Sequence, residues 1–195
     1  MYSRSEIESY RQRITAIHQA LGIADSYHKT IKLPLQFEAR TLANAGTDVF
    51  NRPQQLTPDA LKYWREMQAA ATKDDITLNL VSAFRSVDYQ HRLIARKLAA
   101  GQSIEHILTV NAAPGYSEHH TGRALDITTI ECEPLSETFA DTPAFAWLRI
   151  NAARYGFVLS YPRDNPYGLA YEPWHWALSE TTADQSSADS SSQKS

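Results

Sequence analysis

The chain has 195 residues, of which 43% are hydrophobic and 21% are charged, a composition typical of a globular protein. Its formal net charge of −3 gives no basic surface of the kind that binds nucleic acid or anionic membranes, so neither is expected as a partner. No apolar run reaches the roughly 20 residues of a membrane span, and a single cysteine, Cys132, excludes an internal disulfide and a cysteine-cluster metal site.

The N-terminal segment is polar and charged and lacks the apolar stretch of a secretion signal. We therefore expect a cytoplasmic protein, with a periplasmic location or export by another route as the alternative. Residues 3–21 carry apolar side chains at alternating spacings of three and four, which predicts an amphipathic helix that ends at Gly22. We expect residues 1–24 to form an extension that packs on the main domain, and the protein to be a monomer.

Residues 24–55 have no clear hydrophobic period and are expected to be mainly loop. A helix is predicted from Pro58, because Thr57 is a good N-cap and proline fits the first helical turn. Apolar residues then alternate with polar ones over residues 76–80, which predicts a half-buried strand.

The second half of the chain contains further helices and most of the predicted strands. Cap signals and apolar runs predict helices at 87–100, 103–108 and 143–155, and strands at 124–128, 157–161 and 174–178. Residues 181–195 are rich in Ser, Thr, Asp and Gln, which predicts a disordered tail. Because helices and strands do not alternate regularly, we predict an α+β fold with one domain over residues 25–180.

Two short segments carry side chains suited to a metal site. The first reads SEHHTGRALD and contains His119 and Asp126, and the second reads EPWHW and contains His175. Catalytic zinc takes three protein ligands from His and Asp or Glu, and leaves one position for water. Gly122 lets the chain turn between His119 and Asp126, so both can reach one ion, and His175 on a later strand can supply the third ligand.

Glu172 lies three residues before His175, and Pro173 stiffens the link between them. A carboxylate that lies beside a zinc ion without binding it can take a proton from the attacking water and return it to the leaving amine. We therefore predict that Glu172 is a general base and acid.

These segments resemble a known family signature. S-x-H-x-x-G-x-A-x-D followed by E-P-W-H resembles the motif pair of VanY-type D-alanyl-D-alanine carboxypeptidases, whose superfamily includes the lysostaphin-type peptidases and the zinc domain of hedgehog proteins. Other segments follow the family order: SAFRS at 82–86, YQ at 89–90, PGYSEH at 114–119 and YGF from 155. The resemblance covers roughly residues 55–180, and implies a small antiparallel sheet that carries the zinc site, with helices packed around it.

The resemblance implies one zinc ion per chain, held by His119, Asp126 and His175, and a catalytic role for Glu172. Adjacent histidines cannot both face one ion, and the register of the motif selects His119. His120 is therefore expected to be structural or to support the ligands.

The resemblance also implies residues that act on the substrate. Arg85 matches an arginine that stabilises the developing oxyanion, although an ion pair with Asp88 is the simpler alternative. Ser117 matches a serine that binds the terminal carboxylate, and Gln90 matches a glutamine of the substrate pocket. Ala83 stands where the family often has glycine.

The activity that the resemblance implies is hydrolysis of the terminal D-Ala–D-Ala bond of peptidoglycan stem peptides or their precursors. Two alternatives stay open: an endopeptidase or endolysin that cuts within the peptide, and a zinc-stabilised binding module without catalysis. Arg85, Ser117 and Gln90 together favour an exopeptidase, because all three suit a terminal carboxylate. Retention of both Arg85 and Glu172 argues against the non-catalytic module.

Overall fold

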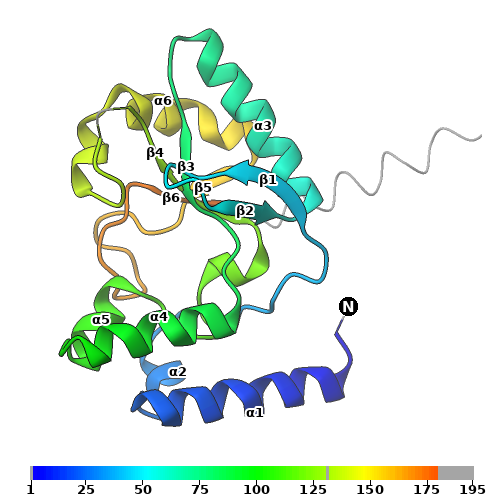
Figure 1. The fold of residues 1–195 in the computed structure, drawn as a ribbon, viewed down its shortest axis with the longest axis vertical. Coiled ribbons are helices and arrows are strands. Elements are labelled where there is room, and N and C mark those ends of the chain that lie inside the picture. Colours follow the sequence, from blue (N-terminus) through cyan, green and yellow to red (C-terminus); the bar gives the residue numbers. More distant parts are fainter. Residues whose placement is uncertain (1, 131, 180–195) are drawn as a thin grey trace, which may run out of the picture.

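A four-stranded antiparallel sheet with strand order β3-β4-β6-β5 lies at the centre of the molecule (Figure 1). This computed structural model describes residues 2–130 and 132–179, so the predicted tail at 181–195 lies outside the described residues. The strands are β1 (Ala43–Thr47), β2 (Pro53–Leu56), β3 (Asn79–Ser82), β4 (Ala124–Thr128), β5 (Phe157–Leu159) and β6 (His175–Leu178). The helices are α1 (Arg4–Leu21), α2 (Tyr27–Thr30), α3 (Pro58–Lys73), α4 (Val87–Ala99), α5 (Ile104–Val110) and α6 (Pro143–Asn151), with short 3-10 helices η1 (Glu118–Thr121), η2 (Glu137–Asp141) and η3 (Ala152–Tyr155).

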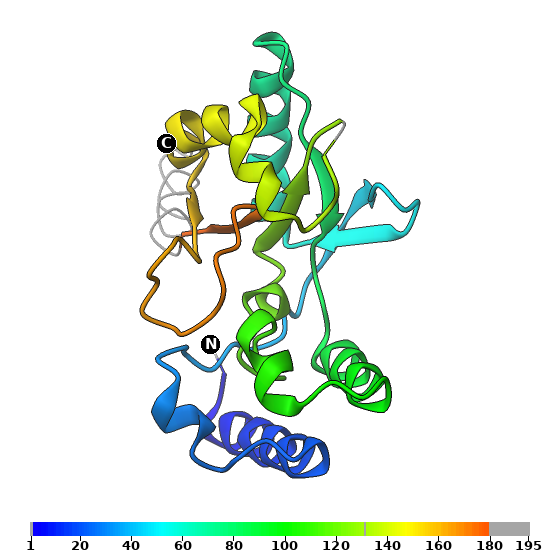
Figure 2. The same ribbon diagram turned by 90° about the vertical axis from the view of Figure 1, so that its left-hand side faces the viewer.

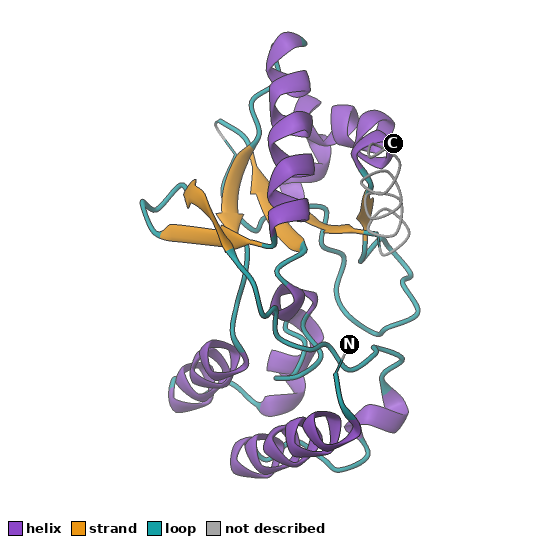
Figure 3. Cartoon of the chain, turned by 90° about the vertical axis from the view of Figure 1, so that its right-hand side faces the viewer, coloured by secondary structure: helices purple, strands orange, loops and turns teal. Residues whose placement is uncertain are grey.

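The main hydrophobic core lies between the sheet and the helices α3 and α6, which share one side of the molecule (Figures 1 and 3). Trp64 and Met67 of α3 pack there with Leu125 and Ile127 of β4 and with Phe157 of β5. All five side chains are buried, and each contributes on the order of 2 kcal/mol by leaving water. This core fixes the position of β4. It therefore also fixes the position of the polar side chains on the opposite face of β4.

A second core joins α1 to α4 and α5 in the part of the molecule remote from α3 and α6 (Figure 2). Ile14 and Ile17 of α1 pack there with Val87 and Ile94 of α4 and with Ile107 of α5. The N-terminal helix is therefore part of a packed helical layer. None of the helices in the described ranges is long and apolar enough to cross a bilayer.

The predicted helix starts at Thr57, Ser86 and Thr142 are confirmed, because each side chain accepts a hydrogen bond from the first turn of the helix that follows. Ser3, which the prediction placed inside the first helix, caps α1 in the same way. Gly22 ends α1 in the left-handed conformation, with φ at +71°. These signals depend only on local chemistry, which is why the sequence shows them.

Residues 24–55 are mainly loop, as expected, but they contain most of an antiparallel hairpin, β1–β2, that was not predicted and whose turn is held by buried Asp48. Asp48 accepts hydrogen bonds from the backbone N–H groups of Phe50 and Arg52 and from the side chains of Arg52 and Gln54. A single polar side chain specifies this turn, so no hydrophobic period marks it. The strand predicted at 76–80 begins only at Asn79, where pairing with β4 starts.

Candidate active site

Asp126 and His175 are brought together by the register of two neighbouring strands. In the antiparallel pair β4–β6, these residues lie directly opposite each other. Side chains at opposite positions of such a pair lie on the same face of the sheet, with Cβ atoms about 5 Å apart. Because Leu125 and Ile127 point into the main core, Asp126 points to the opposite face, and His175 joins it there.

His119 reaches the same face from η1, which immediately precedes β4. Gly122 ends η1 with a φ of +64°, and its N–H donates to the carbonyl of His119. A Cβ at this position would come within 2.9 Å of the Leu42 side chain. Glycine suits this left-handed backbone conformation, and a larger residue would also press on Leu42, as the motif spacing indicated.

The three predicted ligands form a compact buried group. Asp126 Oδ1 lies 3.2 Å from His119 Nε2 and 3.1 Å from His175 Nδ1, and all three ligand atoms lie within 4.8 Å of one another. Ligands of a tetrahedral zinc ion with bonds of about 2.0 Å are about 3.3 Å apart. Two imidazole nitrogens and one carboxylate oxygen also suit zinc better than magnesium or calcium. Donor set and spacing therefore fit zinc.

The far nitrogen of each histidine is held by an acceptor. His119 Nδ1 donates to the carbonyl of Ala83 at 2.6 Å, and His175 Nε2 donates to Glu118 Oε2 at 2.8 Å. Each bond engages the far nitrogen of the ring, so the nitrogen that points at Asp126 is the one placed to bind a metal. The ligand atoms would consequently be Nε2 of His119 but Nδ1 of His175.

Glu118 is the functional residue that the sequence interpretation missed. Burial acts to raise the pKa of this carboxyl group, but the hydrogen bond and charge of His175, the hydrogen bond with Ser160 and the charge of His119 together outweigh burial, and the pKa is lowered. A carboxylate that accepts from a ligating imidazole orients the ring and makes it a stronger ligand. The position of Glu118 next to His119 in the motif was the available signal, although its contact is with His175, 57 residues away.

Replacing Glu118 by glutamine should weaken zinc binding by about ten- to a hundredfold, because a neutral amide polarises His175 less than a carboxylate does. A competition titration with a chelator measures the change. Glu66→Gln, on the exposed face of α3, is the matched control and should bind zinc like the unmodified chain. Equal zinc affinity in Glu118→Gln and the control would remove Glu118 from the site.

The carboxylates around His175 strongly affect its protonation. Burial lowers the pKa of His175, but Asp126 and Glu118 outweigh burial and raise it to about 10. The pKa of Asp126 is held well below its usual range against burial, chiefly by His119 and His175. A proton on His175 must leave before Nδ1 can bind a metal, so zinc affinity should rise with pH.

Glu172 lies beside the ligand group without joining it. Its Oε2 is 3.8 Å from His175 Nδ1, and its backbone N–H donates to the carbonyl of Tyr161. Burial raises the pKa of Glu172 to about 7. A carboxyl group with a pKa near neutrality can both accept and donate a proton, which suits the predicted base and acid.

A small cavity of about 30 Å³ opens on this group. Its walls contain six of the seven predicted site residues, all except Asp126: Arg85, Gln90, Ser117, His119, Glu172 and His175. They are joined by residues that the sequence interpretation left unassigned, among them Asn111, Ala112, Tyr161 and Leu169. The fold therefore gathers residues from five separate segments around one cavity.

Arg85 faces the ligand group. Its Nη2 lies 3.8 Å from Asp126 Oδ2, while Asp88 pairs with Arg13 at 2.7 Å. The simpler alternative, an ion pair between Arg85 and Asp88, is therefore wrong. The Nε of Arg85 is buried and has no hydrogen-bond partner within residues 2–130 and 132–179. A buried donor of this kind is available for a ligand anion.

Gln90 presents an acceptor to the cavity. Its Nε2 donates to the carbonyl of Ala112 at 2.9 Å, which fixes the orientation of the amide. Its Oε1 is buried and has no partner in the described part of the chain. The amide oxygen suits an N–H of a substrate, and the second N–H of Nε2 can still donate to a carboxylate, so the role of Gln90 at the substrate terminus stays a prediction.

His120 has the structural role that was expected. It is fully buried, and its Nδ1 donates to the carbonyl of Arg85 at 2.6 Å. Its Nε2 accepts from the N–H of Gly115 at 3.1 Å. His120 thus connects the segment of Arg85 to the loop before Ser117.

Comparison with known proteins finds that the chain is similar to carboxypeptidases. The family model VanY, described as D-alanyl-D-alanine carboxypeptidase, matches residues 53–180. YodJ of Bacillus subtilis (strain 168) is 37% identical over 120 residues, which are 60% of this chain and 42% of YodJ. The bifunctional D-Ala-D-Ala dipeptidase and D-Ala-D-Ala carboxypeptidase VanXYC of Enterococcus gallinarum is 32% identical over 127 residues, which are 62% of this chain and 65% of that protein.

The chain spans less than two thirds of the length of either relative. Among solved structures, that of the LD-carboxypeptidase LdcB is 29% identical, with a TM-score of 0.67. The match covers 81% of this chain and 77% of that structure. The predicted α+β fold is therefore one that this family shares.

Proposed function

Because the chain belongs to the VanY family of D-alanyl-D-alanine carboxypeptidases, we propose that it is a zinc carboxypeptidase acting on peptidoglycan stem peptides or their precursors. The observation that carries the proposal is the shared cavity, where Glu172 and the unpaired Nε of Arg85 lie around the His119–Asp126–His175 group. A metal site that served only for stability would need neither a carboxyl group beside the ligands nor a buried N–H donor without a partner.

Zinc held by the three ligands would supply a Lewis acid that lowers the pKa of the attacking water and polarises the scissile carbonyl. Glu172 takes a proton from that water and later delivers it to the leaving amine. The guanidinium of Arg85, whose Nε is buried and has no partner among the described residues, stabilises the negative charge that develops on the substrate. Gln90 Oε1 accepts an N–H of the substrate and fixes the direction of the peptide.

We further propose that the peptide bond cleaved is the terminal D-Ala–D-Ala bond. The support for this bond is that VanXYC, 32% identical to this chain over 127 residues, is a D-Ala-D-Ala carboxypeptidase. The second candidate is L,D-carboxypeptidase activity, which the likeness to LdcB favours. The two activities differ in the residue before the scissile bond, so matched peptides distinguish them.

A pentapeptide that ends in D-Ala–D-Ala should yield the tetrapeptide and free D-Ala, with no internal fragments. Its C-terminal amide should be cleaved at least about tenfold less efficiently in kcat/KM, because buried donors that lose an anionic partner typically cost 1–3 kcal/mol each. Ser117→Ala should reduce this preference for the free acid, whereas the exposed Ser9→Ala should not. Liquid chromatography with mass spectrometry follows all the products.

Other outcomes of this assay lead to different assignments. Faster cleavage of the tetrapeptide than of the pentapeptide would assign the L,D activity. Equal cleavage of acid and amide, or release of internal fragments, would assign an endolysin-like peptidase with the same metal chemistry.

A further inference from the structure

One wall of the substrate cavity is the loop of residues 112–117. Ala112 and Ser117, at the two ends of this loop, both line the cavity. The carbonyl of Ala112 also holds the side chain of Gln90, and Ser117 leads directly into η1, which carries His119. A shift of the loop would therefore move Ser117 and release Gln90 together.

The outer side of this loop is bonded to the N-terminal segment of the chain. His18 Nε2 of α1 donates to the carbonyl of Pro114 at 2.8 Å, and this bond is buried. The Tyr27 hydroxyl accepts from the N–H of Ala113 at 3.1 Å, also in a buried position. Buried backbone groups need such partners, because an unpaired one typically costs 1–3 kcal/mol.

Gly115, at the centre of the loop, is held from two sides. Its carbonyl accepts from the N–H of Gln36 at 2.7 Å, while its N–H donates to His120 on the side of the active site. A Cβ on Gly115 would lie 2.8 Å from Ile14 of α1, so helix and loop are in direct contact. The loop is thus fixed between the site and the N-terminal segment.

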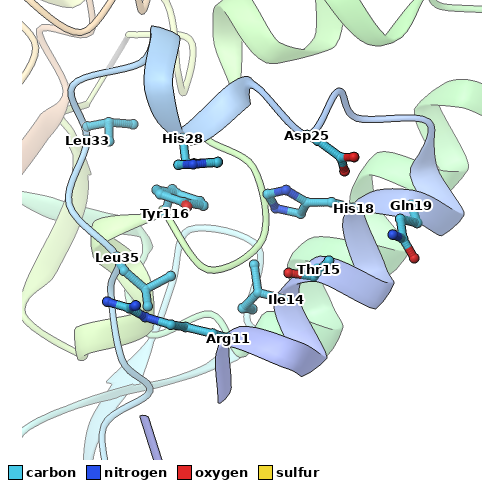
Figure 4. Close-up of a pocket in the computed structure, with 10 residues that line it drawn as sticks. All are labelled: Arg11, Ile14, Thr15, His18, Gln19, Asp25, His28, Leu33, Leu35 and Tyr116. Atoms are coloured by element: carbon cyan, nitrogen blue, oxygen red, sulfur yellow. The ribbon is translucent and has the colours of Figure 1, made fainter. Parts of the chain in front are cut away.

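Aromatic packing strengthens this attachment. The ring of Tyr116 lies 5.4 Å from that of Tyr27 and 5.8 Å from that of His18. Figure 4 shows His18 and Ile14 extending from α1 toward the loop that carries Tyr116, around a cavity of about 530 Å³. His28 lines the same cavity but is exposed.

We propose that residues 14–36 position the substrate-binding loop, and that His18 is a positioning residue for substrate binding. Residues 14–36 lie outside the range of 53–180 that the family model matches. A segment that precedes the matched range therefore contributes to the active site. The inference rests on the proposed function, because it takes the cavity at the metal group as the substrate site. His18 acts through Pro114 and Ser117, and touches no substrate itself.

The test uses the full chain loaded with zinc. His18→Ala should raise KM for the peptide that the unmodified chain cleaves by about tenfold, the effect of one buried hydrogen bond. Its kcat and zinc content should stay within about twofold of the unmodified chain, because neither the ligands nor Glu172 moves. His18→Gln should restore most of the affinity, since its Nε2–H can reach Pro114, and His28→Ala is the matched control.

A double substitution separates positioning from general destabilisation. If His18 acts through Ser117, the fold increase in KM of the double variant His18→Ala/Ser117→Ala should be clearly smaller than the product of the fold increases of the two single variants. The proposal would be overturned if the fold increases in KM of the two single variants multiplied in the double variant. A fall in kcat or zinc content without a change in KM would also overturn it. Tyr27→Phe, which removes only the hydroxyl group, should act in the same direction as His18→Ala and provides a milder variant.

Hydrogen exchange tests the loop without any substrate, and so remains decisive if the proposed activity fails. The amide protons of Ala113, Gly115 and Tyr116 should exchange at least about tenfold faster in zinc-loaded His18→Ala than in His28→Ala. Exchange in the main core, at β4, should be the same in both variants. Unchanged exchange in the loop would show that α1 does not position it.

Discussion

Glu172→Gln should lower kcat by roughly 10²–10⁴-fold while zinc stays bound. Glutamine keeps the size of the side chain but cannot accept the proton of the attacking water. Because Glu172 lies beside the ligand group without joining it, the metal should be unaffected. Release of D-Ala measures the rate, and elemental analysis measures the zinc.

Glu66→Gln, the exposed control, should keep full activity. More than about a tenth of the normal rate in Glu172→Gln would show that another group activates the water. In that case Glu118, a second carboxylate close to His175 that is not a predicted ligand, would become the first candidate.

His119→Ala should abolish zinc binding and reduce activity below detection. A catalytic zinc site needs its three protein ligands, and loss of one leaves two that cannot hold the ion at neutral pH. In the unmodified chain, added zinc should raise Tm and a chelator should lower it, because zinc binds the folded state. Tm of His119→Ala should respond to neither.

His106→Ala, which changes an exposed histidine on α5, should keep the metal and the response of Tm to zinc. About one zinc ion per chain in His119→Ala would show that the ligand set is different. A variant that loses zinc but keeps its activity would separate the metal from the reaction.

Helix boundaries and ligand identities could be read from the sequence because they depend on residues close together in the chain. Thr57 caps the start of α3, and Gly22 ends α1. The spacing of His119, Gly122 and Asp126 indicated a turn between two ligands, and the left-handed φ of Gly122 confirms that turn. The β1–β2 hairpin was missed because Asp48 specifies it through polar contacts that have no period.

The sequence by itself determined which residue types form the site: two imidazoles, a ligating carboxylate, a second carboxylate and an arginine. The tertiary structure alone decided their hydrogen bonds, because these depend on side chains far apart in the chain. It set which nitrogen of each histidine points at Asp126, paired Glu118 with His175, and bonded the Gln90 amide nitrogen to the carbonyl of Ala112. It also placed α1 behind the loop of Ser117, since packing of Ile14 on Gly115 is a contact between segments about 100 residues apart.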